Sequence, residues 1–182
     1  LKTTLLKGKK AIDQTTTKVG IRTIDVSKEY GFRLNGKSLK FKGVCLHHDL
    51  GALGAALNKT AVIRQIEMMK KMGVNAIRTS HNMPSQMQMD VCDSLGMMVM
   101  AESFDAWKDL KVKNGYGRIY DEWWRKDLEN LIKGHRNHPS IVMWSIGNEI
   151  PEQSKKEGTL RAKAMTEYCH SLDSTRAVTC GV

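Results

Sequence analysis

From Leu39 onward, short runs of strand-type apolar residues alternate with longer stretches in which apolar residues recur every three or four positions. The short runs predict strands, and the longer spacing predicts helices with one apolar face. The predicted strands cover residues 39–46, 74–81, 97–104, 141–149 and 177–182. Regular alternation of strand and helix is typical of a parallel sheet with helical crossovers. We therefore predict an α/β fold.

The predicted helices carry recognisable start signals. The helix expected over residues 58–73 can be capped by Asn58 or Thr60. Pro84 suits the first helical position of the second helix, and the third helix begins at Asp121. The apolar stripe of the fourth helix consists of Leu160, Ala164, Tyr168 and Leu172. Each helix thus has one face with which to cover the sheet.

The first part of the chain has a different pattern. Residues 17–26 alternate in β fashion with no helical pattern nearby, and "LNGK" at 34–37 is typical of a hairpin turn. We assign residues 1–33 to the end of a β domain or a linker. Residues 34–182 are assigned to the N-terminal half of a (β/α)₈ barrel, the TIM fold, because a closed barrel needs roughly 200 residues or more. About five parallel strands are expected.

Composition and charge exclude several classes of protein. The chain is 41% hydrophobic and 26% charged, which is typical of a soluble globular protein. No apolar stretch approaches the roughly 18 residues of a membrane span, and the start lacks the apolar core of a signal peptide. The formal charge of +10 comes from scattered residues, and its densest group, Lys7, Lys9 and Lys10, has no interleaved aromatic residue. We predict a solvated basic surface, with no nucleic-acid or membrane partner. The compartment stays open.

Polar residues gather where the predicted strands end. The carboxyl ends of parallel barrel strands meet at one rim, where ligands bind. The residues after the first four strands are His47, His48 and Asp49, then Arg78, Ser80, His81 and Asn82, then Glu102 and Asp105, and finally Asn148 and Glu149. A strand interior disfavours an adjacent amide and carboxylate, and an unpaired buried carboxylate is costly. The Asn148–Glu149 pair is therefore predicted to face a site that uses it.

Three segments resemble one enzyme family. "FRLNGKSLKFKGVCLHHD", "GVNAIRTSHNMPS" and "GHRNHPSIVMWSIGNEI" are similar, in family order, to the barrel domain of glycoside hydrolase family 2. The resemblance covers about residues 31–150. It implies a retaining glycosidase that cleaves terminal β-glycosides by double displacement, with β-galactosides as the predicted substrates. Within the family, β-glucuronidase and β-mannosidase are alternatives. It also implies that residues 1–33 end an immunoglobulin-like sandwich domain or form a linker.

The resemblance also implies roles for individual residues. Glu149 matches the general acid/base, and Asn148 matches the amide that holds the sugar 2-hydroxyl. Arg78 can also orient a catalytic carboxylate. The predicted substrate-binding residues are His47, Arg78, His81, Glu102 and Asn148.

A general acid must hold its proton until the leaving oxygen departs, so Glu149 requires a raised pKa from apolar walls or nearby negative charge. Trp144 and Met143 can line such walls, or they can be core residues of the strand. The family's nucleophilic carboxylate belongs to the seventh strand, which is expected beyond Val182. A retaining glycosidase needs both carboxyl groups, so the isolated chain is expected to be inactive.

No metal or cofactor is predicted. Some galactosidases of this family bind magnesium just after the third strand, but this chain has Ala106 and Trp107 there. Zinc is a rival hypothesis because His135 and His138 are three residues apart, yet no H-E-x-x-H or Cys/His quartet is present. The four cysteines show no metal spacing.

Two hypotheses without enzymatic activity also stay open. A non-catalytic carbohydrate-binding or scaffold module is the alternative from another class of protein, and a nucleic-acid-binding protein is the third. A half-barrel exposes two strand edges and an apolar inner face, so the isolated chain is expected to self-associate.

Overall fold

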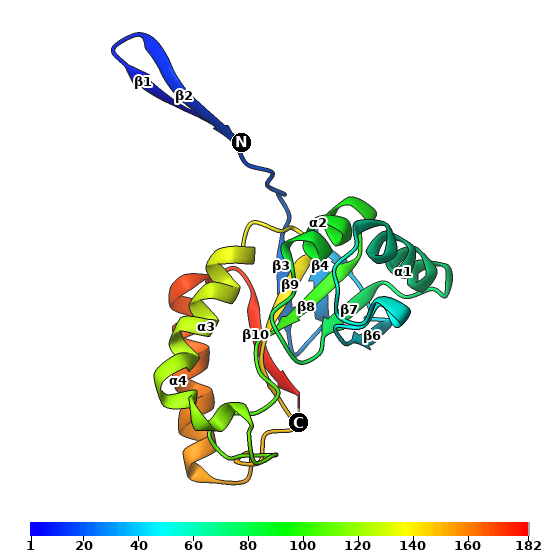
Figure 1. Cartoon of the computed structure of the whole chain (residues 1–182), viewed down its shortest axis with the longest axis vertical. Helices are drawn as coiled ribbons and strands as arrows, with labels where there is room; N and C mark the ends of the chain where they lie inside the picture. Colours follow the sequence, from blue (N-terminus) through cyan, green and yellow to red (C-terminus); the bar gives the residue numbers. More distant parts are fainter. Residues whose placement is uncertain (182) are drawn as a thin grey trace.

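The computed structural model describes residues 1–181 and contains a curved five-stranded parallel sheet with four helices (Figure 1). The strands are β1 (Lys2–Lys7), β2 (Lys10–Thr16), β3 (Ile24–Ser27), β4 (Gly31–Leu34), β5 (Lys37–Ser38), β6 (Gly43–Leu46), β7 (Ala76–Thr79), β8 (Met98–Glu102), β9 (Ile141–Asn148) and β10 (Ala177–Gly181). The helices are α1 (Lys59–Lys71), α2 (Gln86–Leu95), α3 (Tyr120–His135) and α4 (Lys156–Leu172). The predicted α/β class is confirmed.

The parallel sheet has the strand order β10-β9-β8-β7-β6, so consecutive strands are neighbours throughout. In register, Val44 lies opposite Ile77, and Ile77 lies opposite Val99. A helix joins each strand of this sheet to the next, as in a (β/α)₈ barrel. The sheet is therefore the first five strands of such a barrel, as the sequence predicts.

Local signals account for the helix boundaries. Of the two caps proposed for α1, Asn58 is the one used, because its Oδ1 accepts a hydrogen bond from Ala61 N at 3.0 Å. Ser85 caps α2 with its hydroxyl, so Pro84 precedes the cap and is not the first helical residue. Gly96 ends α2 at φ 68°, a left-handed conformation that glycine adopts without strain.

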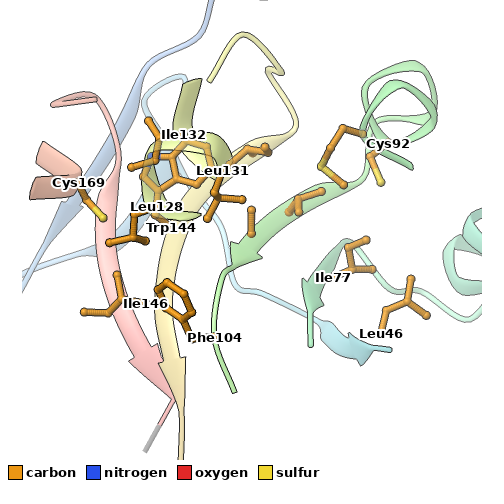
Figure 2. Packing of buried hydrophobic residues seen from close by; sticks show 14 of the residues in the cluster. Leu46, Ile77, Cys92, Phe104, Leu128, Leu131, Ile132, Trp144, Ile146 and Cys169 are labelled. Atoms are coloured by element: carbon orange, nitrogen blue, oxygen red, sulfur yellow. The ribbon is translucent and has the colours of Figure 1, made fainter. Parts of the chain in front are cut away.

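The main core lies between the sheet and the helices that cover its outer face (Figure 2). Trp144 from β9 is its largest fully buried side chain, and its Nε1 donates a hydrogen bond to Asp173 Oδ2 at 3.0 Å. Of the two uses that the sequence leaves open for Trp144, the structure selects the core. The labelled core side chains in Figure 2 are Leu46, Ile77, Cys92, Phe104, Leu128, Leu131, Ile132, Trp144, Ile146 and Cys169.

The N-terminal region contains antiparallel β-strands, as predicted, but their bounds differ from the prediction. Strand β1 pairs with β2 in an antiparallel hairpin that stands apart from the barrel, with every residue exposed (Figure 1). This hairpin buries nothing, so its sequence carries no strong apolar alternation. Within the predicted strand 17–26, only its last residues belong to a strand, β3. The turn predicted at 34–37 is confirmed: Asn35 and Gly36 both have positive φ and join β4 to β5.

Phe32 from β4 packs with Ala76, Met98 and Val142 at the amino-terminal ends of the barrel strands. The small β3–β4–β5 sheet therefore covers the bottom of the half-barrel. The predicted domain boundary after residue 33 lies within β4 and stays a prediction.

Two further predictions from the sequence concern the length of a strand and the length of the helices. The strand predicted over 39–46 pairs only from Gly43, because the Asn75 side chain occupies the preceding backbone: its Oδ1 accepts from Lys42 N and its Nδ2 donates to Lys40 O. No helix within residues 1–181 is long and apolar enough to cross a membrane.

Candidate active site

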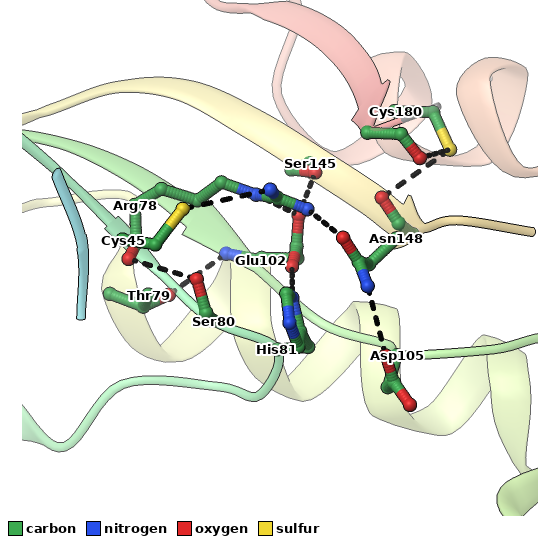
Figure 3. Close-up of polar contacts among 12 residues, drawn as sticks. Cys45, Arg78, Thr79, Ser80, His81, Glu102, Asp105, Ser145, Asn148 and Cys180 are labelled. Atoms are coloured by element: carbon green, nitrogen blue, oxygen red, sulfur yellow. Dashed lines mark hydrogen bonds and ion pairs between the residues drawn. The ribbon is translucent and has the colours of Figure 1, made fainter. Parts of the chain in front are cut away.

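A fully buried carboxylate organises the carboxyl-terminal end of the sheet (Figure 3). Glu102, the last residue of β8, accepts hydrogen bonds from Arg78 Nε at 2.6 Å and Ser145 Oγ at 2.6 Å through Oε2. Its Oε1 lies 2.7 Å from His81 Nδ1, and its backbone N–H donates to Thr79 Oγ1. Both carboxylate oxygens therefore have partners, which offsets the cost of burial.

Arg78, on β7, links this carboxylate to the next strand. Burial by itself would lower the pKa of Arg78, but the hydrogen bond and charge of Glu102 outweigh burial and raise it. Its Nη2 donates to Asn148 Oδ1 at 2.8 Å. Arg78 thus carries its positive charge at the centre of the group, between β8 and β9.

Asn148 ends β9 and is buried, with both ends of its amide engaged. Its Nδ2 donates to Asp105 Oδ1 at 3.0 Å. Lys111 Nζ donates to the same Asp105 oxygen at 2.9 Å and to the backbone oxygen of Asn148 at 2.8 Å. Asp105 and Lys111 come from the long connection between β8 and α3, which therefore reaches the end of β9.

Glu149 follows directly and has an exposed side chain. Its φ of 42° is unusual for a residue other than glycine. Its backbone N–H donates to Gly181 O on β10 at 2.7 Å, which holds this conformation. The apolar wall proposed for Glu149 does not come from Trp144, which lies in the core behind the sheet.

The structure brings the predicted site residues to one end of the sheet. Five residues form one hydrogen-bonded group, which we call the rim: Arg78, His81, Glu102, Ser145 and Asn148 (Figure 3). His47 lies beside this rim, with its ring centroid 5.1 Å from that of His81 in an edge-on arrangement. Glu102 lies beneath the others, and its predicted contact with the sugar stays a prediction.

Sequence reasoning missed Ser145 and Lys111. Ser145 is a small polar residue in an otherwise apolar strand, which was the available signal, and the structure places it opposite Glu102. Lys111 lies in a polar loop without periodic pattern, so only the tertiary structure shows that it reaches Asn148.

The histidines considered for zinc lie at the opposite end of the sheet. His138 Nδ1 is 2.6 Å from Asp93 Oδ2, and Asp93 Oδ1 accepts from Ser140 N at 2.9 Å. Within the described residues, Asp90, Asp93 and His138 place ligand-type atoms within 4.8 Å of one another, without His135. Existing hydrogen bonds already occupy both oxygens of Asp93, so these contacts favour a structural role.

Parallel barrel strands that deliver a polar rim at their carboxyl ends define the chain as part of a TIM-barrel enzyme domain. Residues 24–182 match the model of the TIM barrel domain of glycosyl hydrolases family 2, and the chain belongs to that family.

Among curated relatives, β-galactosidase BoGH2A of Bacteroides ovatus is 40% identical over 100% of this chain and 25% of its own length. A putative β-glucuronidase of Formosa agariphila is 43% identical over 99% of the chain and 17% of its own length. The chain thus spans about a quarter or less of these relatives.

Solved structures show the same fold. A family 2 member from Bacteroides cellulosilyticus superposes with a TM-score of 0.95 at 45% identity, covering 98% of this chain and 23% of that one. A β-D-glucuronidase from Dictyoglomus thermophilum gives a TM-score of 0.85 at 29% identity, covering 97% of this chain and 31% of that one.

Proposed function

We propose that the protein containing this chain is a retaining β-glycosidase that cleaves terminal β-galactosides. The observation that carries this proposal is the rim, in which Arg78, His81 and Asn148 are held together next to Glu149 at the ends of β7 and β9, with Glu102 of β8 between them. The similarity to β-galactosidase BoGH2A supports the choice of sugar.

In this proposal Glu149 is the general acid/base. It protonates the glycosidic oxygen as the bond to the aglycone breaks, and it then removes a proton from the water that attacks the glycosyl-enzyme. Its exposed side chain is accessible to substrate and water. Neighbouring Asn148 holds the sugar 2-hydroxyl.

The other rim residues form the sugar subsite. His47, Arg78 and His81 face the sugar and the catalytic carboxylates, and Glu102 fixes Arg78 and His81 from below. A carboxylate with a partner on each oxygen keeps both neighbours in place, and its full burial argues against a role as the nucleophile.

The nucleophile is proposed to come from outside these residues. Retention requires a second carboxyl group about 5–5.5 Å from the acid/base. Glu102 is fully engaged, and Asp105 is paired with Lys111 and Asn148. The isolated 182-residue chain is therefore expected to show no hydrolysis.

A second candidate substrate is a terminal β-glucuronide, because several relatives are named β-glucuronidases, including that of Homo sapiens at 30% identity. The decisive assay measures kcat/KM of the full-length natural protein on aryl β-galactoside, β-glucuronide and β-mannoside with one leaving group. Proton NMR of the first product then gives the stereochemistry. A β-anomer supports retention, and an α-anomer contradicts it. Binding of a sugar without turnover of any substrate would favour the non-catalytic carbohydrate-binding module.

We also propose that the isolated chain self-associates and binds neither nucleic acid nor membranes. Strands β6 and β10 are the edges of the described sheet, each with one neighbour. Next to β6, helix α1 leaves Met68 and Met72 exposed. Sedimentation of the isolated chain at tens of micromolar tests the self-association, and a compact monomer would contradict it.

A further inference from the structure

Two side chains of the connection between β8 and α3 hold Asn148. Asp105 Oδ1 accepts from Asn148 Nδ2 at 3.0 Å, and Lys111 Nζ donates to Asn148 O at 2.8 Å. Asp105 and Lys111 also pair directly at 2.9 Å. These three contacts form a closed triangle around the end of β9.

The chemistry of the neighbours dictates which way the Asn148 amide points. A guanidinium has only donors and an ionised carboxylate has only acceptors. The oxygen of the amide must therefore face Arg78, and its nitrogen must face Asp105, as observed. A flipped amide would place like groups together on both sides.

Asp105 stays ionised under the conditions in which it must accept this bond. Partial burial alone would raise the pKa of Asp105, but hydrogen bonds from Lys111 and Asn148 outweigh it and lower the pKa. The acceptor is therefore present throughout the neutral and mildly acidic range.

The connection that carries these residues is itself anchored. The backbone N–H of Asp109 donates to Oε1 of the buried Glu152 at 2.9 Å, and the Asp109 side chain pairs with Lys155. The loop after β8 is thereby tied to the loop after β9, where Glu149 lies. Asp105 and Lys111 are thus presented from a fixed backbone.

An amide nitrogen carries two protons, and an amide oxygen has two lone pairs. With one of each engaged by Asp105 and Arg78, Asn148 offers one N–H and one lone pair to a ligand in a set direction. We propose that Asp105 and Lys111 are positioning residues that aim the Asn148 amide at the sugar 2-hydroxyl. This inference rests on the proposed glycosidase function.

The test uses Asp105→Ala in the full-length natural protein. Two aryl β-glycosides are compared that share a leaving group and differ only in a 2-hydroxyl or 2-deoxy carbon. We expect kcat/KM for the 2-hydroxy substrate to fall about 10-fold to 100-fold, the effect of a lost charged hydrogen bond. For the 2-deoxy substrate we expect a fall below about threefold, because it lacks the group that Asn148 binds. Lys111→Met should show the same pattern, with a larger fall in kcat/KM for the 2-hydroxy substrate than for the 2-deoxy substrate.

Asp121→Ala is the matched control, since it removes an exposed carboxylate that pairs with Lys108 of the same connection, away from Asn148 and from the anchor at Asp109. This control should change kcat/KM for the two substrates by the same factor. An equal loss on both substrates in Asp105→Ala would overturn the inference, because it would indicate a general structural effect.

A second measurement does not depend on activity. A crystal structure of the wild type should show the Asn148 amide in its present contacts, and a crystal structure of Asp105→Ala should show the amide rotated away from them. An amide left in place would overturn the inference. If the wild type hydrolyses no glycoside, the proposed function fails, whereas these two structures still decide whether Asp105 positions Asn148.

Discussion

The two ends of the barrel strands both contain buried ion pairs, but they use them differently. At the amino-terminal end, a group that we call the floor consists of Arg22, Asp93, His138, Asp173 and Arg176. Each guanidinium nitrogen of Arg176 donates a bond: Nε to Ile141 O, Nη1 to Asp173, and Nη2 to backbone oxygens. The floor thus ties Arg176 mainly to backbone oxygens, with four of its five N–H donors engaged.

The rim has similar groups but leaves some of them open. Within residues 1–181, Arg78 Nη1 makes only a weak contact with Cys45 Sγ at 3.8 Å. Asn148 keeps one proton and one lone pair free, as described above. Similar residue types therefore bind the backbone at one end and leave donors and acceptors open at the other, where we propose that the sugar binds. The kind of acceptor separates the two ends: Arg176 donates mostly to backbone oxygens, whereas Arg78 donates to the side chains of Glu102 and Asn148.

The largest expected effect concerns Glu149, which lies next to the rim. Glu149→Gln in the full-length protein should reduce hydrolysis of substrates with poor leaving groups about 10²-fold to 10⁴-fold, because the acid is lost. Activated aryl glycosides should lose less in the first step. Azide needs no base and should restore turnover with a β-glycosyl azide as product.

The control for this variant is Glu157→Gln, an exposed carboxylate in the first turn of α4, which should leave activity unchanged. An α-azide product, or no rescue in a folded variant, would move the acid/base role from Glu149 to another residue.

The next effect concerns the floor. Arg176→Met leaves Asp173 buried without its cation, so the free energy of unfolding of the barrel should fall by about 3–5 kcal/mol. Urea denaturation followed by tryptophan fluorescence measures this change. The exposed Arg118→Met is the control. A loss below about 1 kcal/mol would show that buried Asp173 tolerates the removal of its cation, which contradicts a structural role for the floor.

A third effect is pH dependence at the floor end. Burial, with a smaller contribution from His138, lowers the pKa of His135 from 6.5 to about 4. The unfolded chain therefore takes up a proton before the folded one. Stability should fall as the pH drops from about 6.5 to 4, by up to about 3 kcal/mol.

His135→Gln should flatten this pH dependence between about 6.5 and 4, whereas substitution of the exposed His170 should leave it unchanged. Measuring the free energy of unfolding at several pH values distinguishes these results. An unaltered slope in His135→Gln would assign the acid sensitivity to other groups.

The smallest expected effect tests whether the position of Arg78 in the rim matters for activity. A Cβ at Gly181 would lie 2.4 Å from Arg78 Nη2, so Gly181→Ala must displace the guanidinium. We expect kcat/KM of the full-length protein to fall about tenfold, equivalent to about 1.4 kcal/mol, with little change in stability. Gly43→Ala is the control, because its Cβ would lie at an ordinary 3.4 Å from Ala76 O. Unchanged kinetics in Gly181→Ala would show that the position of Arg78 is not critical.

The sequence by itself determined the order of strands and helices in the barrel and the end of the sheet at which polar residues gather. Both follow from local periodicity: an apolar run ends where polar residues begin, and parallel strands place these ends together. His47, Arg78, His81, Glu102, Asn148 and Glu149 could be placed for this reason.

Which residues face one another was decided only by the tertiary structure. Strict alternation along β9 would put Trp144 on the same face as Asn148. The register shifts against β10 between Ser145 and Asn148, so Asn148 lies with Ser145 on the side of Arg78 and Glu102, while Trp144 packs in the core. A bulge depends on the neighbouring strands, and periodicity does not reveal it. The contact of Lys111 with Asn148 likewise joins residues 37 apart in sequence, and only the folded loop brings them together.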